Sequence, residues 1–173
     1  MWRELPADTQ WWEVELDAAD LSRVRVFPRS HWREIADDNF ALAEIARNIR
    51  ARAGRGLNGD FLAKIRSLRT HLREEERPAT VILLIGIDEC SPLTIIEGNH
   101  RMVAAMLLSP HIVCQRFRFV CGLSPRMAEC CWYKTDLSTL LHYTKNVIRY
   151  FLSDRDAALE SLLFRIQQSR MHS

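Results

Sequence analysis

Four polar side chains of different chemistry surround one glycine in the run Glu97-Gly98-Asn99-His100-Arg101. A carboxylate, an amide, an imidazole and a guanidinium thus occur within five residues. Such groups are unfavourable between buried elements unless they pair or bind something, so their concentration predicts a functional site. The alternative is structural. Glu97 or Asn99 would cap a helix and Gly98 would supply a positive φ, while His100 would be a satisfied core histidine and Arg101 a surface residue.

This run joins two apolar segments that are expected to be buried. Residues 93–96 are rich in β-branched side chains and predict a short strand. Residues 102–108 are rich in Ala, Met and Leu, which predicts a buried helix. The polar residues therefore fall at a strand-to-helix turn. A helix N-terminus there offers unpaired N–H groups and a positive dipole end to an anion, and Gly98 would let the backbone approach it closely.

The wider pattern predicts an α+β fold, with a small mixed β-sheet packed against several helices. Strands are expected at 12–16, 21–27, 80–87, 93–96 and 113–120, with the apolar run 80–87 in the centre. Helices are expected at 31–53 after an N-cap at Ser30, and at 60–76, 102–108, 136–152 and from 153 to about 166. We expect one domain over residues 1–173, with a core at about 12–122 and a C-terminal helical extension at about 129–170.

Positive charge concentrates between Arg23 and Arg77, mainly on the predicted helices 31–53 and 60–76. An ordinary charged surface accounts for this, because arginines in the last turns of a helix complement its dipole. The second interpretation is a patch that steers an anionic substrate, a nucleotide or a nucleic acid, to which Arg116 and Arg118 would add.

Length and composition bound the class of protein. The chain has 173 residues, 47% of them hydrophobic and 27% charged, with a formal net charge of +2, which is typical of a globular protein with one core. No apolar run reaches the roughly 20 residues that span a bilayer, and the first residues lack the apolar core of a signal peptide. We expect a cytoplasmic protein without membrane contact. The five cysteines form no C-x-x-C pair and are expected to be structural thiols, with neither zinc nor haem bound.

The strand, the EGNHR turn and the apolar helix together resemble the signature of the ParB/sulfiredoxin-like superfamily, whose members carry a G-x-H-R or related turn at this place. The preceding segment is similar as well, with a short N-terminal strand, helical material and a strand after Pro78. The resemblance covers about residues 12–120. It implies a ParB/sulfiredoxin-like core for this chain.

In that superfamily the turn holds nucleotide phosphates. The resemblance therefore implies Gly98 and Asn99 as a backbone cradle, with His100 and Arg101 as phosphate ligands. Glu97 occupies a position where relatives often have an acid, which makes it a candidate base or metal-organising group. The implied catalytic set is Glu97, His100 and Arg101, and the implied cofactor is ATP, ADP or CTP with Mg²⁺.

Residues just before the first predicted C-terminal helix are further candidates. Lys134 would add a phosphate contact, and Trp132 or Tyr133 would stack on a base. Core packing is the alternative role for these two aromatic residues.

This chain differs from two branches of the superfamily, and each difference argues against membership of that branch. Asn99 stands where sulfiredoxins place their reactive cysteine, which argues against sulfinic-acid repair. Partition-type ParB proteins have a Gly-Glu-Arg-Arg-like turn followed by a helix-turn-helix, and residues 136–170 have no such pattern. The resemblance is closer to small free-amino-acid kinases and phosphotransferases with G-x-H-R turns.

Three functions stay open from the sequence. The first is a nucleotide-dependent phosphoryl-transfer or NTP-hydrolysing enzyme that uses residues 97–101. The second is a nuclease or DNA-modification partner that uses the basic helices to bind nucleic acid. The third is a non-catalytic nucleotide-sensing or interaction module. The expected partner is a nucleotide or another phosphate-bearing small molecule, and the oligomeric state stays open.

Overall fold

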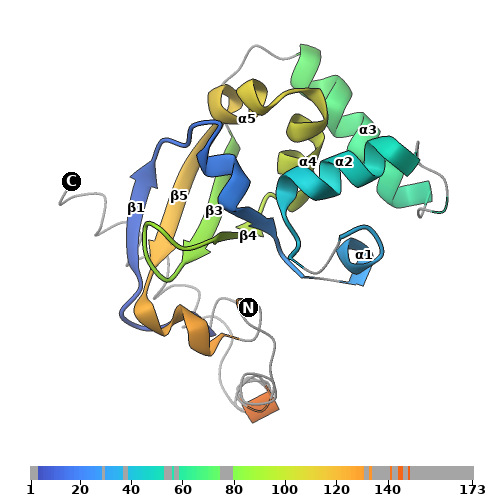
Figure 1. Cartoon of the computed structure of the whole chain (residues 1–173). Coiled ribbons are helices and arrows are strands. Elements are labelled where there is room, and N and C mark those ends of the chain that lie inside the picture. Colours follow the sequence, from blue (N-terminus) through green and yellow to red (C-terminus); the bar gives the residue numbers. More distant parts are fainter. Residues whose placement is uncertain are drawn as a thin grey trace. The chain divides into compact units, whose positions relative to one another are not determined.

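Among the residues that the structure describes, five strands form one mixed β-sheet in the computed structural model of the chain (Figure 1). The structure describes residues 4–28, 30–36, 39–52, 56, 59–74, 80–130, 133, 141, 144–145 and 148. The strand order is β1 (Gln10–Val14), β5 (Phe117–Leu123), β3 (Thr80–Gly86), β4 (Leu93–Glu97) and β2 (Val24–Val26). The predicted α+β class is confirmed, and the apolar strand β3 lies in the centre as predicted.

Strand β4 has one parallel and one antiparallel neighbour. It runs parallel to β2, with Ile95 opposite Val26, and antiparallel to β3, with Ile95 opposite Leu84. Its first four residues are buried and only Glu97, the last one, is exposed. The chain therefore leaves the core at Glu97, where the polar turn begins.

The chain divides into two compact units. The larger unit consists of Glu13–Ile85 and Pro92–Cys121, and the smaller of Met1–Trp12, Gly86–Ser91 and Gly122–Ser173. In the smaller unit, a short 3-10 helix (η3, Pro125–Glu129) follows Ser124. The larger unit contains the EGNHR turn and every element that surrounds it.

Helix α4 (Asn99–Leu108) is the central helix of the larger unit. Helices α2 (Leu42–Arg52) and α3 (Gly59–Glu74) both pack against it (Figure 1). Five of its residues are buried, namely Met102, Val103, Ala104, Ala105 and Leu107. A helix covered on several sides needs apolar residues nearly all round, which explains the sequence of α4. Packing from its neighbours fixes the position of its N-terminus.

The single helix predicted from His31 to Ala53 is wrong, because the chain forms two helices there. α1 covers Ser30–Arg33, so Ser30 is inside the first helix, and α2 begins only at Leu42. Between them Phe40 has φ 54° and its carbonyl accepts the N–H of Val26 at 2.9 Å. Pairing of this segment with the edge strand β2 interrupts the helix. The predicted helix 60–76 is confirmed as α3 up to Glu74, and residues 75 and 76 lie outside the described residues.

The strand predicted at 113–120 is wrong in its first half, where the chain forms helix α5 (Pro110–Arg116). The Ser109 hydroxyl accepts the N–H of His111 at 3.2 Å and caps this helix, while the proline occupies its first turn, where no N–H partner is needed. In β5 itself Phe117 and Phe119 are buried and Arg118 is exposed, as the alternation predicted. Arg116 ends a helix, so it does not share a strand face with Arg118.

Candidate functional site

The polar turn is built around a glycine in the left-handed conformation. Gly98 has φ 100° and ψ 10° and lies between β4 and α4. A Cβ at this position would overlap Cδ1 of Ile82, a fully buried side chain of β3. The Gly98 carbonyl accepts the N–H of Met102 at 2.9 Å, which begins the hydrogen bonding of α4. Only glycine fits here without strain or a shift in the core.

The turn opens on a cleft of about 460 Å³, a volume in the range of small-molecule sites. Its lining comes from β4, the N-terminus of α4, α1 and one face of α3, and consists of Trp32, Lys64, Leu68, Ile96, Glu97, Gly98, Asn99, His100 and Arg101. The structure therefore brings all five residues of the predicted turn to one cleft. It adds Lys64 as a second cation beside Arg101, and Trp32, Leu68 and Ile96 as apolar surface.

Glu97 and Arg101, the first and last residues of the turn, form an ion pair. Nη2 of Arg101 lies 3.1 Å from Oε1 of Glu97, four residues earlier in the chain. The arginine side chain is 24% exposed and the glutamate 59% exposed. An exposed pair at this spacing stabilises the protein by only about 0.3–0.5 kcal/mol. An anionic ligand can therefore displace Glu97 from the Arg101 guanidinium at little cost in free energy.

Asn99 has a structural role in addition to any role in binding. Its Oδ1 accepts the backbone N–H of Phe27 at 2.8 Å, across 72 positions of sequence. This bond ties the first turn of α4 to the segment that follows β2. The side-chain oxygen is thus already used, which leaves the backbone as the part of Asn99 suited to a ligand, in keeping with the cradle role implied by the resemblance.

Replacing Asn99 with alanine is expected to lower the free energy of unfolding by about 1–3 kcal/mol, because the partly buried N–H of Phe27 loses its acceptor. Asn99→Asp keeps an oxygen in that place, so it should retain most of the stability while adding a negative charge to the cleft. Denaturant unfolding of the two variants measures the difference. An equal loss in both would contradict the role assigned to Oδ1.

His100 belongs to an aromatic cluster that joins three helices. Its ring centroid lies 5.0 Å from that of Trp32 in α1 and 5.6 Å from that of Phe61 in α3. Trp32 and Phe61 pack edge to face at 5.0 Å, with an interplanar angle of 82°. Both aromatic side chains are buried. The cluster fixes the imidazole beside the turn and joins the wall formed by α3 to the helix N-terminus.

The residues at the cleft fit a metal ion only if the ligand supplies most of its coordination. Glu97 is the single carboxylate in the lining, and no group of three or more His, Cys, Asp or Glu residues suited to a metal occurs in the described part of the chain. Mg²⁺ is commonly held by one or two carboxylates together with substrate phosphates and water. A Mg²⁺ ion shared between Glu97 and bound phosphates is compatible with this arrangement, provided that Glu97 turns away from Arg101.

Several arginines of the basic region, and Arg116 beyond it, form hydrogen bonds with other parts of the chain. Three of them donate to carbonyls at or near helix ends: Arg50 to Met106 (2.8 Å), Arg52 to Glu34 (2.7 Å) and Arg116 to Leu72 (3.4 Å). Cations at helix C-termini satisfy unpaired carbonyls and the helix dipole. These contacts support the ordinary-surface interpretation of the basic region.

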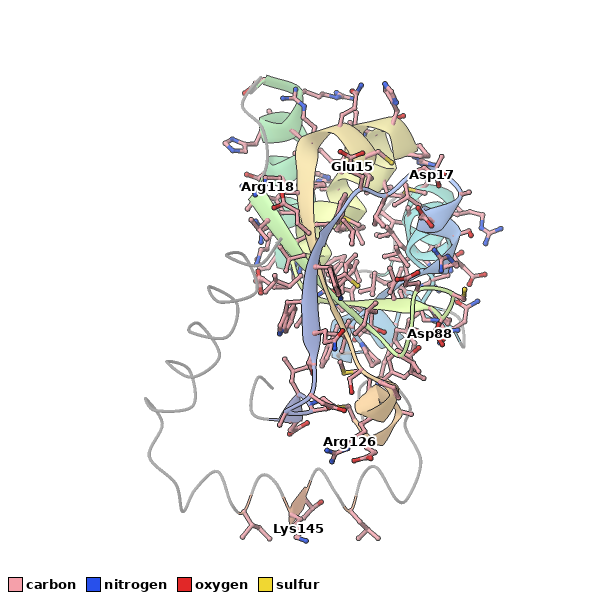
Figure 2. All side chains as sticks on the ribbon, turned by 90° about the vertical axis from the view of Figure 1, so that its left-hand side faces the viewer. Glu15, Asp17, Asp88, Arg118, Arg126 and Lys145 are labelled. Carbon is pink, nitrogen blue, oxygen red and sulfur yellow. The ribbon has the colours of Figure 1, made fainter. Side chains whose placement is uncertain are left out.

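Arg118, labelled in Figure 2, is also paired. Its Nε and Nη2 donate to the two carboxylate oxygens of Glu13 at 2.7 and 2.8 Å. Both side chains are about half exposed. The Arg118 guanidinium is therefore held by a bidentate ion pair with Glu13, which belongs to the same larger unit.

The four described cysteines are free thiols, and two of them are poorly suited to nucleophilic chemistry. Burial raises the pKa of Cys121 to about 12. Burial, followed by the charges of Asp17 and Asp20, also raises the pKa of Cys114. A raised pKa keeps the thiol protonated at neutral pH, and the thiolate is the reactive form. These observations support the structural role predicted for the cysteines.

Two parts of the site were not predicted from the sequence. Trp32 and Lys64 line the cleft although they lie far from the turn in the chain. The signal for Lys64 was present, since it precedes Leu68 by four residues and residues at this spacing share a helix face. Lys134, the predicted phosphate contact, lies outside the described residues, as does Trp132. The same holds for the C-terminal helices predicted at 136–152 and 153–166, apart from residues 141, 144–145 and 148, which are helical.

Comparisons with protein-family models, with curated proteins and with solved structures found no significant match to this chain. Within the described residues, no helix is long and apolar enough to cross a membrane.

Proposed function

We propose that the cleft at the EGNHR turn binds the phosphate groups of a nucleotide, with ATP, ADP or CTP as the candidates, or of another phosphate-bearing small molecule. The observation that carries the proposal is the meeting of the left-handed Gly98, the N-terminus of α4 and the side chains of His100, Arg101 and Lys64 at one cleft. The first N–H groups of a helix have no partner within it, and together with nearby cations they favour a phosphate.

The chemistry we propose is phosphoryl transfer or NTP hydrolysis on a ParB/sulfiredoxin-like core. Such reactions depend mainly on positioning and on neutralising the charge of the transferring group. Arg101 would neutralise that charge, and His100, fixed by its aromatic neighbours, would hold a phosphate oxygen. Glu97 would accept the proton of the attacking hydroxyl or water. A Mg²⁺ ion would supply further charge neutralisation, with the ligand phosphates and water as its main ligands.

Turnover by purified protein tests this proposal. We expect phosphate release or transfer from one of ATP, ADP and CTP in the presence of Mg²⁺. Glu97→Gln should lower the rate about 100-fold or more, because general-base catalysis typically contributes that much. Nucleotide binding should persist in this variant, since the change removes a negative charge from the cleft. Turnover that continues unchanged in both Arg101→Ala and His100→Ala would contradict the proposal.

A second candidate is a non-catalytic nucleotide-sensing module on the same cleft. One observation favours it: Glu97, the only carboxylate among the described lining residues, is paired with Arg101 rather than placed free for proton transfer. Nucleotide would then raise the melting temperature without being consumed, since a ligand that binds the native state stabilises it. Measurable turnover that Glu97→Gln abolishes would exclude this candidate.

A further inference from the structure

We infer that Lys64 contacts a second phosphate, beyond the one held at the turn, so that the cleft selects ligands with two or more linked phosphates over monophosphates. The inference rests on the proposed function and deepens it. It assigns a binding role to a residue on α3, a helix that ends at Glu74, 23 positions before the turn begins at Glu97.

The geometry places Lys64 on the correct face of α3. Phe61, Lys64 and Leu68 occur three and four residues apart, which puts them on one side of the helix. Phe61 packs on the ring of His100 with a centroid distance of 5.6 Å, and Leu68 lines the same cleft as Lys64. Lys64 therefore projects from the helix face that rests against the turn, one turn beyond the contact with His100.

The charges in the cleft distinguish Lys64 from Arg101. Arg101 is already paired with Glu97, whereas Lys64 makes no hydrogen bond or ion pair with any residue of the described ranges. A ligand phosphate that reaches Lys64 gains a charge-assisted contact without displacing another group. The ammonium lies on a long flexible stem, which suits a contact at a distance from the anchored turn.

The two cations come from different walls of a cleft of about 460 Å³. Lys64 belongs to α3 and Arg101 to α4, two helices that pack against each other. A single phosphate held by the turn engages only the groups of α4. A second, linked phosphate extends the ligand toward α3, so the gain from Lys64 is specific to diphosphate and triphosphate compounds.

The test compares binding of inorganic phosphate, pyrophosphate, AMP and ADP to the full chain by isothermal titration calorimetry at one ionic strength. Lys64→Met keeps the apolar stem and removes the charge. This substitution should lower the affinity for pyrophosphate and for ADP about tenfold or more, and change the affinity for phosphate and for AMP by less than about threefold. Arg66→Met removes an exposed charge from α3 outside the cleft lining and should leave all four affinities within about twofold of wild type.

Each outcome bears on one of the two proposals. Suppose that wild type binds ADP. If Lys64→Met binds ADP with the same affinity, or if its affinities for AMP and ADP fall by the same factor, the role of Lys64 is overturned and the proposed function stands. If folded wild type binds none of the four probes, the role of Lys64 is overturned together with the phosphate site.

Discussion

Gly98→Ala is expected to lower the free energy of unfolding by about 2–5 kcal/mol. Two separate effects contribute. An L-residue at φ 100° is strained by about 1–2 kcal/mol, and the added methyl group overlaps Cδ1 of Ile82, where overpacking adds about 1–3 kcal/mol. Urea or guanidinium unfolding gives the total. The effect is on folding, so it is measured without any ligand.

Two further variants separate these contributions. Gly56→Ala introduces a methyl group at φ 73° with no atom within 4 Å, so it reports conformational strain alone. Ile82→Val removes Cδ1. In combination with Gly98→Ala it should therefore restore the free energy of unfolding that the overlap costs and leave only the cost of the conformational strain. A double-mutant cycle measures that coupling. If Gly98→Ala is no more damaging than Gly56→Ala, the close packing of the turn against β3 is contradicted.

Arg101→Ala is expected to weaken nucleotide binding by about 10–100-fold, because a charge-assisted hydrogen bond to phosphate is lost. The change also leaves Glu97 without its partner, which adds negative charge where the ligand binds. Arg101→Lys keeps the charge without the planar guanidinium and should fall between wild type and alanine. Titration calorimetry with ADP and ATP measures all three proteins.

Arg118→Ala is the matched control for this experiment. Arg118 is also an arginine of the larger unit and is also paired with a glutamate, but it lies outside the lining of the cleft. Its removal changes the net charge by the same amount, so general electrostatic effects are equal in the two variants. Equal affinities of Arg101→Ala and Arg118→Ala would contradict the assignment of Arg101 as a phosphate ligand.

The elements next to the turn were predictable because their signals are local. Residues 80–87 and 93–96 are short apolar runs, residues 102–108 form a longer one, and Gly98 marks the boundary between strand and helix. The structure places β3, β4 and α4 at these positions. Local apolar character was enough here because each element is buried by its neighbours on several sides.

The predictions that were wrong depended on contacts between distant segments. The helix break at Phe40 arises from pairing with β2, which the apolar spacing of 31–53 does not reveal. For α5 the local signals were present, since Ser109 caps the start of this helix and Pro110 occupies its first turn, but a strand was predicted from residue 113. The alternation of Phe117 and Phe119 was then extended too far toward the N-terminus.

Three of the nine described lining residues of the cleft were not assigned to the site from the sequence, namely Trp32, Lys64 and Leu68. The turn supplies its own residues in one run, so their meeting follows from the chain. Trp32 and Lys64 reach the cleft only through the packing of α1 and α3 around His100. The hydrogen bond between Asn99 and Phe27 is equally a tertiary contact, and it adds a structural role for the Asn99 side chain to the backbone role that the resemblance implies.

An NMR titration of isotope-labelled protein with ADP, ATP and CTP in the presence of Mg²⁺ tests the central claim most directly. If the turn binds nucleotide phosphates, at least one nucleotide should shift the backbone amide signals of Gly98, Asn99, His100 and Arg101 most strongly, with smaller shifts at Lys64 and Trp32. Signals from Arg118 and Phe119 in β5 should stay in place. The absence of shifts at residues 98–101 with all three nucleotides, or shifts concentrated elsewhere in the chain, would contradict the claim.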